Sequence, residues 1–143
     1  MYLTPVTYVS TMSNISYFEV PADDIKRAKK FYTEILGWDF ILTQVPGIPV
    51  EYWNITTGKS RKDTLNMGGL YQRQEASSRM LMYARVKDID KALAQVEQLG
   101  GKILSPKMTL DAVGTLVTII DSEGNLIGLW EQEKIRSPYP HSR

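Results

Sequence analysis

The sequence predicts an α+β domain built from two β-α-β-β-β modules with mixed sheets. The first observation is that strand-like and helix-like segments follow the same order in both halves of the 143 residues. The second is that the two helical segments open alike, with Asp24-Ile25-Lys26-Arg27-Ala28 and Asp88-Ile89-Asp90-Lys91-Ala92 lying 64 residues apart. Five elements recurring in order favour a structural repeat over a chance likeness between two amphipathic helices.

The first module opens with a strand and a helix. Residues 15–20 (ISYFEV) are rich in strand-forming side chains and are closed by Pro21. Residues 22–37 predict a helix whose apolar face comprises Ile25, Ala28, Phe31, Tyr32, Ile35 and Leu36. Asp23 or Asp24 is suited to cap its N-terminus, and Gly37 to take the left-handed conformation after its last turn.

The remaining elements complete the repeat. Residues 38–42, 49–56 and 64–71 predict three further strands of module one. Module two is expected to contain a strand at 79–86, a helix at 87–101, and strands at 102–110, 114–121 and 125–132. We expect one domain over residues 13–133, with module one at 13–71 and module two at 79–133. Residues 1–12 would form an arm or an extension foreign to the domain, and residues 134–143 a flexible tail.

Composition and charge exclude several classes of function. The 17 basic and 16 acidic residues give a formal net charge of +1, so no overall field favours nucleic acid as a partner. The apolar runs are shorter than the ~20 residues of a membrane helix, which excludes a membrane-spanning segment. The absence of cysteine excludes disulfides and thiolate chemistry and is typical of the cytoplasm. The expected partner is a small-molecule ligand or another protein.

Three segments together resemble a known family. The chain resembles the vicinal oxygen chelate superfamily in these segments. They are SYFEVPADDIKRAKKFYTEILGW in the first module, and VKDIDKALAQVEQLGGKI and DSEGNLIGLWE in the second. Its members include glyoxalase I, extradiol dioxygenases, and fosfomycin- and bleomycin-resistance proteins. The resemblance covers about residues 13–133 and implies curved sheets that cup a pocket. It constrains the function weakly, because one fold carries many chemistries.

The resemblance also implies where a divalent metal would bind. In the enzymes of the family, His or Gln on each first strand and Glu on each last strand hold the ion. The matching first-strand positions here are Tyr17 and Leu81, and the last-strand positions are Gly128 and Gly68, or Met67 or Gly69 after a shift of one residue. None is a usual ligand, and the only histidine, His141, lies in the expected tail. We therefore expect no metal site and no cofactor.

The pocket is expected to hold a ligand with polar groups on the first strand. Tyr17 and Glu19 share one face of that strand and are the candidate acid-base or hydrogen-bonding residues. Burial would raise the pKa of the Glu19 carboxyl towards neutrality, although Glu19 would equally serve in a structural ion pair. The expected ligand-binding residues, with Tyr52 as the alternative to Trp53, are Tyr17, Glu19, Trp53, Met67, Leu81, Tyr83, Gly128 and Trp130.

Two functions remain open on these grounds. The first is a glyoxalase- or bleomycin-resistance-like protein with a degenerate metal site that binds a small apolar or aromatic molecule, where Gly128 widens the pocket floor. The alternative for Gly128 is a bulge or a close contact between strands. The second function is a lyase, isomerase or dioxygenase, either metal-free with Glu19 and Tyr17 as acid-base groups or with an unorthodox metal site. We expect a homodimer, because the modules would leave strand edges exposed and because proteins of the resembled family often close their pockets across a two-fold axis.

Overall fold

The computed structural model describes residues 12–58 and 67–133. Most of the predicted arm and the whole predicted tail lie outside these residues, as do residues 64–66 of one predicted strand. The elements are β1 (Ile15–Ala22), α1 (Ile25–Leu36), β2 (Asp39–Thr43), β3 (Tyr52–Thr56), β4 (Met67–Gln72), β5 (Leu81–Arg85), α2 (Ile89–Val96), β6 (Lys102–Ile103), β7 (Met108–Leu110), β8 (Gly114–Ile120) and β9 (Leu126–Gln132).

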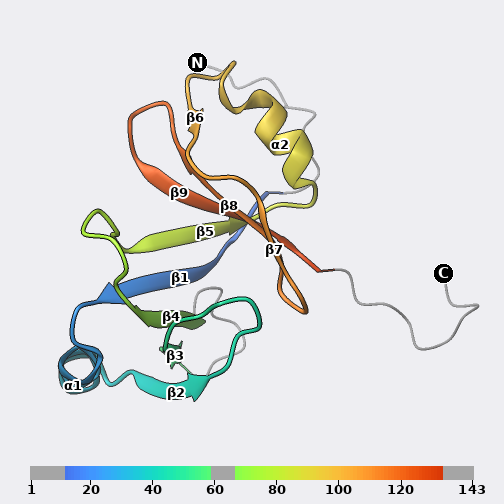
Figure 1. The fold of residues 1–143 in the computed structure, drawn as a ribbon. Coiled ribbons are helices and arrows are strands. Elements are labelled where there is room, and N and C mark those ends of the chain that lie inside the picture. Colours follow the sequence, from blue (N-terminus) through green and yellow to red (C-terminus); the bar gives the residue numbers. More distant parts are fainter. Residues whose placement is uncertain (1–11, 59–66, 134–143) are drawn as a thin grey trace, which may run out of the picture.

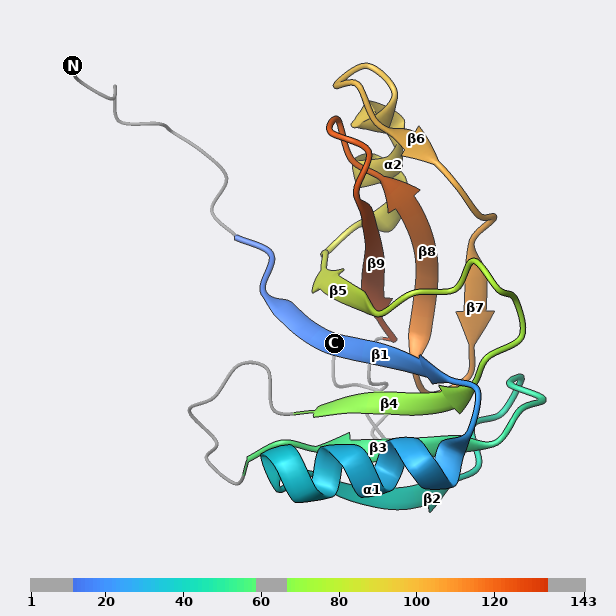
Figure 2. The same ribbon diagram turned by 90° about the vertical axis from the view of Figure 1, so that its left-hand side faces the viewer.

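The strands form one mixed, curled sheet. Its order is β2-β3-β4-β1-β5-β9-β8-β6, and β7 pairs with β8 beside this path (Figure 1). Parallel pairing joins β1 to β4 and β5 to β9, whereas the other neighbours are antiparallel. The second view shows the two halves of the sheet running in different directions, with α1 against one half and α2 against the other (Figure 2). The predicted α+β class with a mixed sheet is confirmed.

The two modules meet where β1 runs antiparallel to β5. Phe18 lies opposite Met82, so the centre of this pairing has the same 64-residue offset as Asp24 and Asp88. Each first strand is flanked by the last strand of its own module, since Glu19 lies opposite Gly69 and Tyr83 opposite Gly128. The repeat read from the sequence is therefore a local two-fold arrangement about the β1–β5 pair.

The helix ends follow the capping chemistry of the sequence. The Asp24 carboxylate accepts the Arg27 backbone N–H at 2.9 Å, and the Asp88 carboxylate accepts that of Lys91 at 3.0 Å. Gly37 has φ 72°, as a left-handed C-cap requires. Helix α2 is shorter than the predicted 87–101, because its last turn tightens into a bond from Gly100 N–H to the carbonyl of Glu97.

Two strand predictions need correction. Strand β1 does not end at Pro21 but runs on to Ala22. The pairing with β5 stops at Glu19, so no hydrogen bond to β5 is lost through the missing N–H of Pro21. The predicted strand 102–110 is two short strands, β6 and β7, both paired with β8. Between them the N–H groups of Leu104 and Ser105 both bond the carbonyl of Thr118, which breaks the ladder just before Pro106.

Alternation along the strands separates an outer core from an inner face. On the outer side of module one, Ile55 and Leu70 are fully buried against Phe18, Val20 and Ile25. Ala84, Ile89, Val117, Ile119 and Leu129 form the corresponding cluster in module two. The neighbouring positions of the same strands, Tyr17, Glu19, Tyr52 and Tyr83, point to the inner face. The helices thus cover the outer face and leave the inner face free to build a site.

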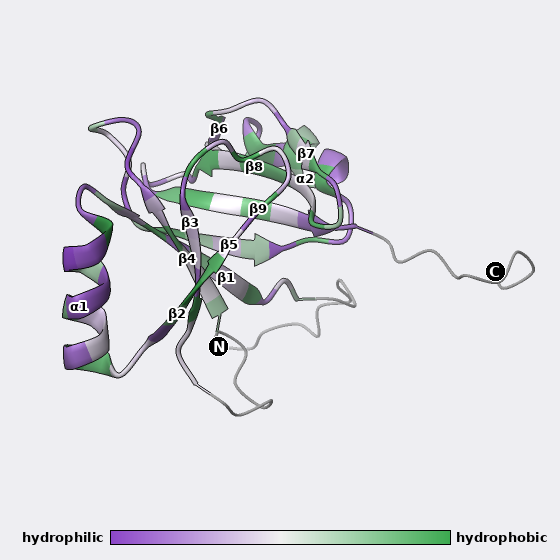
Figure 3. Cartoon of the chain, turned by 60° about the horizontal axis from the view of Figure 1, so that its bottom comes forward, coloured by the Kyte–Doolittle hydropathy of each residue, from purple (hydrophilic) through white to green (hydrophobic). Residues whose placement is uncertain are grey.

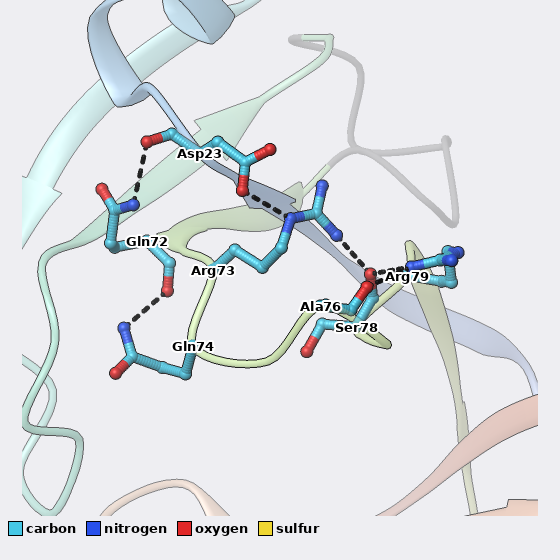
Figure 4. Close-up of polar contacts among 7 residues, drawn as sticks. All are labelled: Asp23, Gln72, Arg73, Gln74, Ala76, Ser78 and Arg79. Atoms are coloured by element: carbon cyan, nitrogen blue, oxygen red, sulfur yellow. Dashed lines mark hydrogen bonds and ion pairs between the residues drawn. The ribbon is translucent and has the colours of Figure 1, made fainter.

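The link between the modules is tied to the start of α1. Arg73 Nε lies 2.9 Å from Asp23 Oδ1, and its guanidinium also donates to the carbonyl of Ser78 (Figure 4). Gln72 Nε2 donates to the Asp23 carbonyl at 2.9 Å. These contacts hold the connection from β4 to β5 against the β1–α1 turn, which fixes how the second module leaves the first. No helix among the described residues has the length and apolar character to span a bilayer.

Candidate ligand-binding site

A cavity of about 310 Å³ lies on the inner face, between the two halves of the sheet. Strands from both modules contribute its aromatic side chains, which are Tyr17, Tyr52, Tyr83 and Trp130. Its aliphatic wall comprises Val45, Pro46, Ile48, Leu110, Val113 and Leu116. The Trp130 indole N–H donates to the carbonyl of Val113 at 2.9 Å, so this ring is held in place. The lining is mostly apolar, as in small-molecule sites.

Two loops from different modules close one side of this cavity. The turn at residues 44–48 and the turn at 111–113 both line it. A Cβ atom on Gly47 would lie 2.8 Å from Leu110 Cδ2, so the first turn is in close contact with the last residue of β7, directly before the second turn. Ala112 has φ 65°, a left-handed conformation that is uncommon for residues other than glycine. Sequence reasoning missed these loop residues, because their contact depends on how the two halves fold together.

Three phenols surround the carboxyl group of Glu19 on the cavity floor. Tyr83 Oη donates to Glu19 Oε1 at 2.8 Å, and Tyr52 Oη donates to Glu19 Oε2 at 3.1 Å. Tyr17 Oη lies 2.6 Å from Tyr52 Oη. Tyr52 and Tyr83 are buried, with only 6% and 8% of their surface exposed. We call Tyr17, Glu19, Tyr52 and Tyr83 the floor cluster.

Burial dominates the acid-base properties of the floor cluster. Loss of solvation raises the pKa of the Glu19 carboxyl, and the hydrogen bonds from Tyr83 and Tyr52 oppose that rise. Burial also raises the pKa of Tyr17 to about 12 and the pKa of Tyr52 and Tyr83 further, with the Glu19 charge acting in the same direction. The phenols therefore keep their protons near neutral pH, and Glu19 is the one carboxyl group of this cluster, with a pKa raised from its usual value by burial.

The structure brings together four of the sequence-predicted site residues. Tyr17, Glu19, Tyr83 and Trp130 line the cavity. Trp53 does not, because its alternation places it on the outer face, where Lys29 Nζ lies 3.3 Å from the ring centroid. Its neighbour Tyr52, the alternative left open, is the inner residue. Met67 and Leu81 lie outside the lining as well, and Met67 is 50% exposed. The catalytic and binding roles of these residues stay predictions.

Gly128 requires a correction. It lies on the inner face, but a Cβ atom there would come within 2.4 Å of the Tyr83 ring. The ring occupies the room that the missing side chain leaves, so Gly128 permits a close contact and does not open the floor. In module one the inner-face glycine is Gly69, whose Cβ would lie 1.8 Å from the Tyr52 hydroxyl. Gly68 faces Phe18, so the one-residue shift considered for this strand is the observed register.

The residues at these positions do not fit a divalent metal. The two glycines offer no donor, Leu81 is apolar, and phenol rings fill the space that glutamates would need. Within residues 12–58 and 67–133, no group of three or more His, Cys, Asp or Glu side chains is placed to hold an ion. The floor cluster, with one carboxyl group and three phenols, lies where the metal ligands of the resembled enzymes would be expected.

A second cavity of about 530 Å³ adjoins the first. Both are lined by Glu19, Ile48, Tyr52, Tyr83 and Leu116. The second extends towards Lys107 and Met108, on the side of β7. The Lys107 ammonium lies 2.5 Å from Asp90 Oδ1 and is therefore already paired with a carboxylate. Three members of the floor cluster, Glu19, Tyr52 and Tyr83, therefore form a common wall of both spaces, whereas Tyr17 lines only the first.

Comparisons with known proteins agree with this architecture. The chain is 32% identical over 114 residues to a glyoxylase-like domain-containing protein of Didymella fabae, covering 78% of this chain and 88% of that one. It is 24% identical over 119 residues to "Putative glyoxylase CFP32" of Mycobacterium bovis, covering 83% of this chain and 46% of the relative. The chain thus spans about half the length of that curated relative.

Solved structures share the fold at low identity. Methylmalonyl-CoA epimerase from Mycobacterium tuberculosis has a TM-score of 0.63 at 16% identity, covering 90% of this chain and 94% of that one. A hypothetical protein from Bacillus halodurans has a TM-score of 0.64 at 12% identity, covering 89% and 99%. A family model matches residues 14–129, which include both modules. The chain belongs to the glyoxalase/bleomycin resistance protein/dioxygenase superfamily.

Proposed function

We propose that this protein binds a small organic molecule with an apolar or aromatic body in the inner-face cavity, without a metal ion. The observation that carries the proposal is the floor cluster, a carboxyl group held by phenols at the base of an apolar, two-module cavity. Such a site combines a large apolar contact area with a few oriented polar groups, which is the usual composition of a small-molecule pocket. The protein would act by holding its ligand.

A metal-free enzyme is the second candidate function. Its supporting observation is the raised pKa of Glu19, caused first by burial, in a group that faces the cavity. A carboxyl group of this kind can accept or donate a proton near neutral pH, which suits a lyase or isomerase step. Binding without turnover in the presence of candidate substrates would separate the first function from the second.

Blocking the cavity is expected to abolish binding. Leu116 lines both cavities, so Leu116→Trp would fill the shared space with an indole ring. We expect affinity for flat apolar fragments, followed by NMR chemical-shift perturbation, to fall at least about tenfold. Leu126→Trp is the matched control, since Leu126 is 40% exposed and lies outside both cavities. Unchanged binding by Leu116→Trp, with a native spectrum, would contradict the proposed location.

We also propose that two copies associate through α1 and the edge strand β2, in the cytoplasm that the cysteine-free composition favours. The predicted core face of α1 is only partly buried, because Phe31 and Ile35 remain 57% and 64% exposed. Ile41 and Leu42 of β2 are 64% and 56% exposed, and β2 appears largely green in the hydropathy view (Figure 3). Apolar side chains at an open strand edge are typical of an association surface.

Light scattering tests this association. We expect a mass of twice the 16.3 kDa chain at tens of micromolar protein, a concentration that would saturate a ~1 μM interface. Leu42→Lys, on the outer face of β2 opposite Trp53 and beside α1, should shift the mass to that of one chain. Leu104 is an exposed apolar residue beyond the other end of the sheet, so the control variant Leu104→Lys should leave the mass unchanged. A wild-type monomer would rule the association out.

A further inference from the structure

We propose that the cavity selects an organic cation, an ammonium or related group carried on an apolar body. The inference rests on the proposed binding function and adds the charge of the ligand. It stands on three features of the described residues: the direction of the hydrogen bonds in the floor cluster, the charges that line the cavity, and the aromatic surfaces around them.

The hydrogen bonds of the floor cluster all run towards Glu19. A phenol has one proton, and those of Tyr83 and Tyr52 are donated to the two carboxylate oxygens. The short contact between Tyr17 and Tyr52 then requires Tyr17 to be the donor, because the Tyr52 proton is already used. With Glu19 ionised, no proton of these four side chains is left for a ligand. The cluster therefore offers a ligand only acceptor lone pairs.

The charges that line the cavity have one sign. Glu19 and Asp111 are the ionisable acids there, and no Lys or Arg is among its described lining residues. Lys107 borders only the adjoining cavity and is paired with Asp90. A partly buried carboxylate without a cationic partner is costly, since phenolic hydrogen bonds replace only part of its lost solvation. A bound cation would supply the missing counter-charge.

Aromatic rings provide the second attraction for a cation. Tyr17, Tyr52, Tyr83 and Trp130 converge on the cavity, and the Tyr17 and Tyr83 rings meet edge to face with centroids 6.4 Å apart. Ring faces attract ammonium groups, more strongly when the site is shielded from water. Lys29 and Trp53 already make such a contact on the outer face. An anionic ligand would instead meet ring faces, acceptor oxygens and like charge.

The wild-type protein can be tested with three probes that share a benzyl or phenyl body. We expect benzylamine, a cation at neutral pH, to bind at least about tenfold more tightly than neutral benzyl alcohol, with benzoate the weakest, in an NMR titration. Benzyl alcohol or benzoate binding as tightly as benzylamine would overturn the cation preference and leave the proposed binding function intact. Failure of all three probes to shift any cavity resonance would overturn both.

Variants and pH identify the group responsible. Glu19→Gln removes the charge and should reduce the preference for benzylamine over benzyl alcohol to less than about twofold. Glu123 is an exposed carboxylate in the β8–β9 turn, so the control variant Glu123→Gln should retain the full preference for benzylamine. If Glu19→Gln fails to fold by circular dichroism, the wild-type pH profile decides. Unchanged selectivity in a folded Glu19→Gln protein would overturn the inference.

The pH profile has a defined sign. Protonation neutralises Glu19, so benzylamine affinity should fall as the pH drops through the carboxyl pKa, which burial holds above the usual range, whereas benzyl alcohol affinity should stay level. The phenols of Tyr17, Tyr52, Tyr71 and Tyr83 keep their protons throughout, because their pKa values are raised. Asp111 shares the cavity lining, and Lys107 stays positive because its bond to Asp90 raises the pKa of its ammonium group. A benzylamine affinity that is constant from pH 8 to about pH 4 would refute the role of Glu19.

Discussion

Replacing Gly128 with alanine is expected to destabilise the fold by about 1–3 kcal/mol, the usual cost of overpacking a well-packed site. The added Cβ would lie 2.4, 2.5 and 2.9 Å from Tyr83 Cδ2, Cε2 and Cγ. Contact with Cγ means that Tyr83 cannot escape by moving only its tip. The φ of Gly128 is not in the left-handed region, so the cost is steric and not conformational. Urea unfolding of the wild type and the variant measures this loss in the free energy of unfolding.

A double-mutant cycle tests the cause. In a Tyr83→Ala background the ring is gone, and Gly128→Ala should then cost less than about 0.5 kcal/mol. The single variant should also weaken binding of a cationic probe, because a displaced Tyr83 no longer donates to Glu19. Equal costs of Gly128→Ala with and without the Tyr83 ring would show that another contact accounts for the glycine.

Replacing Leu70 with alanine is expected to cost about 2–5 kcal/mol, the largest loss foreseen for this chain. Leu70 lies in the middle of β4 with none of its surface exposed, in the outer cluster with Phe18, Val20 and Ile55. Close-packed strands on both sides leave little freedom for neighbours to move into the vacated space. The transition midpoint in urea should fall, with little change in the slope.

Leu126→Ala is the control for this substitution. Leu126 belongs to β9 and is 40% exposed, so the same chemical change should alter the free energy of unfolding by less than about 0.5 kcal/mol. Similar losses at residues 70 and 126 would contradict the burial assigned to the two positions.

Local signals in the sequence predicted much of the fold. The Asp24 carboxylate caps the N-terminus of α1, and Gly37 ends the helix in the left-handed conformation. Both interactions are with residues only a few positions away in the sequence. The 64-residue offset between the helix starts indicated the repeat, and the same offset recurs in the pairing of Phe18 with Met82. Pro21 was misleading because a proline is tolerated in a strand where pairing on one side has ended. Pro106 marked a real break inside a segment predicted to be continuous.

The candidate site was predictable only in part. The alternation of β1 placed Tyr17 and Glu19 on one face, and the structure agrees. Tyr52 and Trp53 are adjacent aromatic residues, so composition could not decide which of them faces inward. The partners of Glu19 come from β3 and β5, 33 and 64 residues away along the chain, and no local pattern predicts that their hydroxyl groups converge. Such contacts exist only after the sheet has curled.

The glycine–tyrosine contacts also limit how this sequence can change over evolutionary time. Gly69 accommodates Tyr52, and Gly128 accommodates Tyr83, so each pair behaves as one unit of variation. A glutamate introduced at residue 128 alone would collide with the ring before it could serve any ion. A chain that acquired carboxylates at these two positions would have to exchange the tyrosine of each pair for a smaller residue first. Residues 69 and 52, and residues 128 and 83, should therefore covary among relatives.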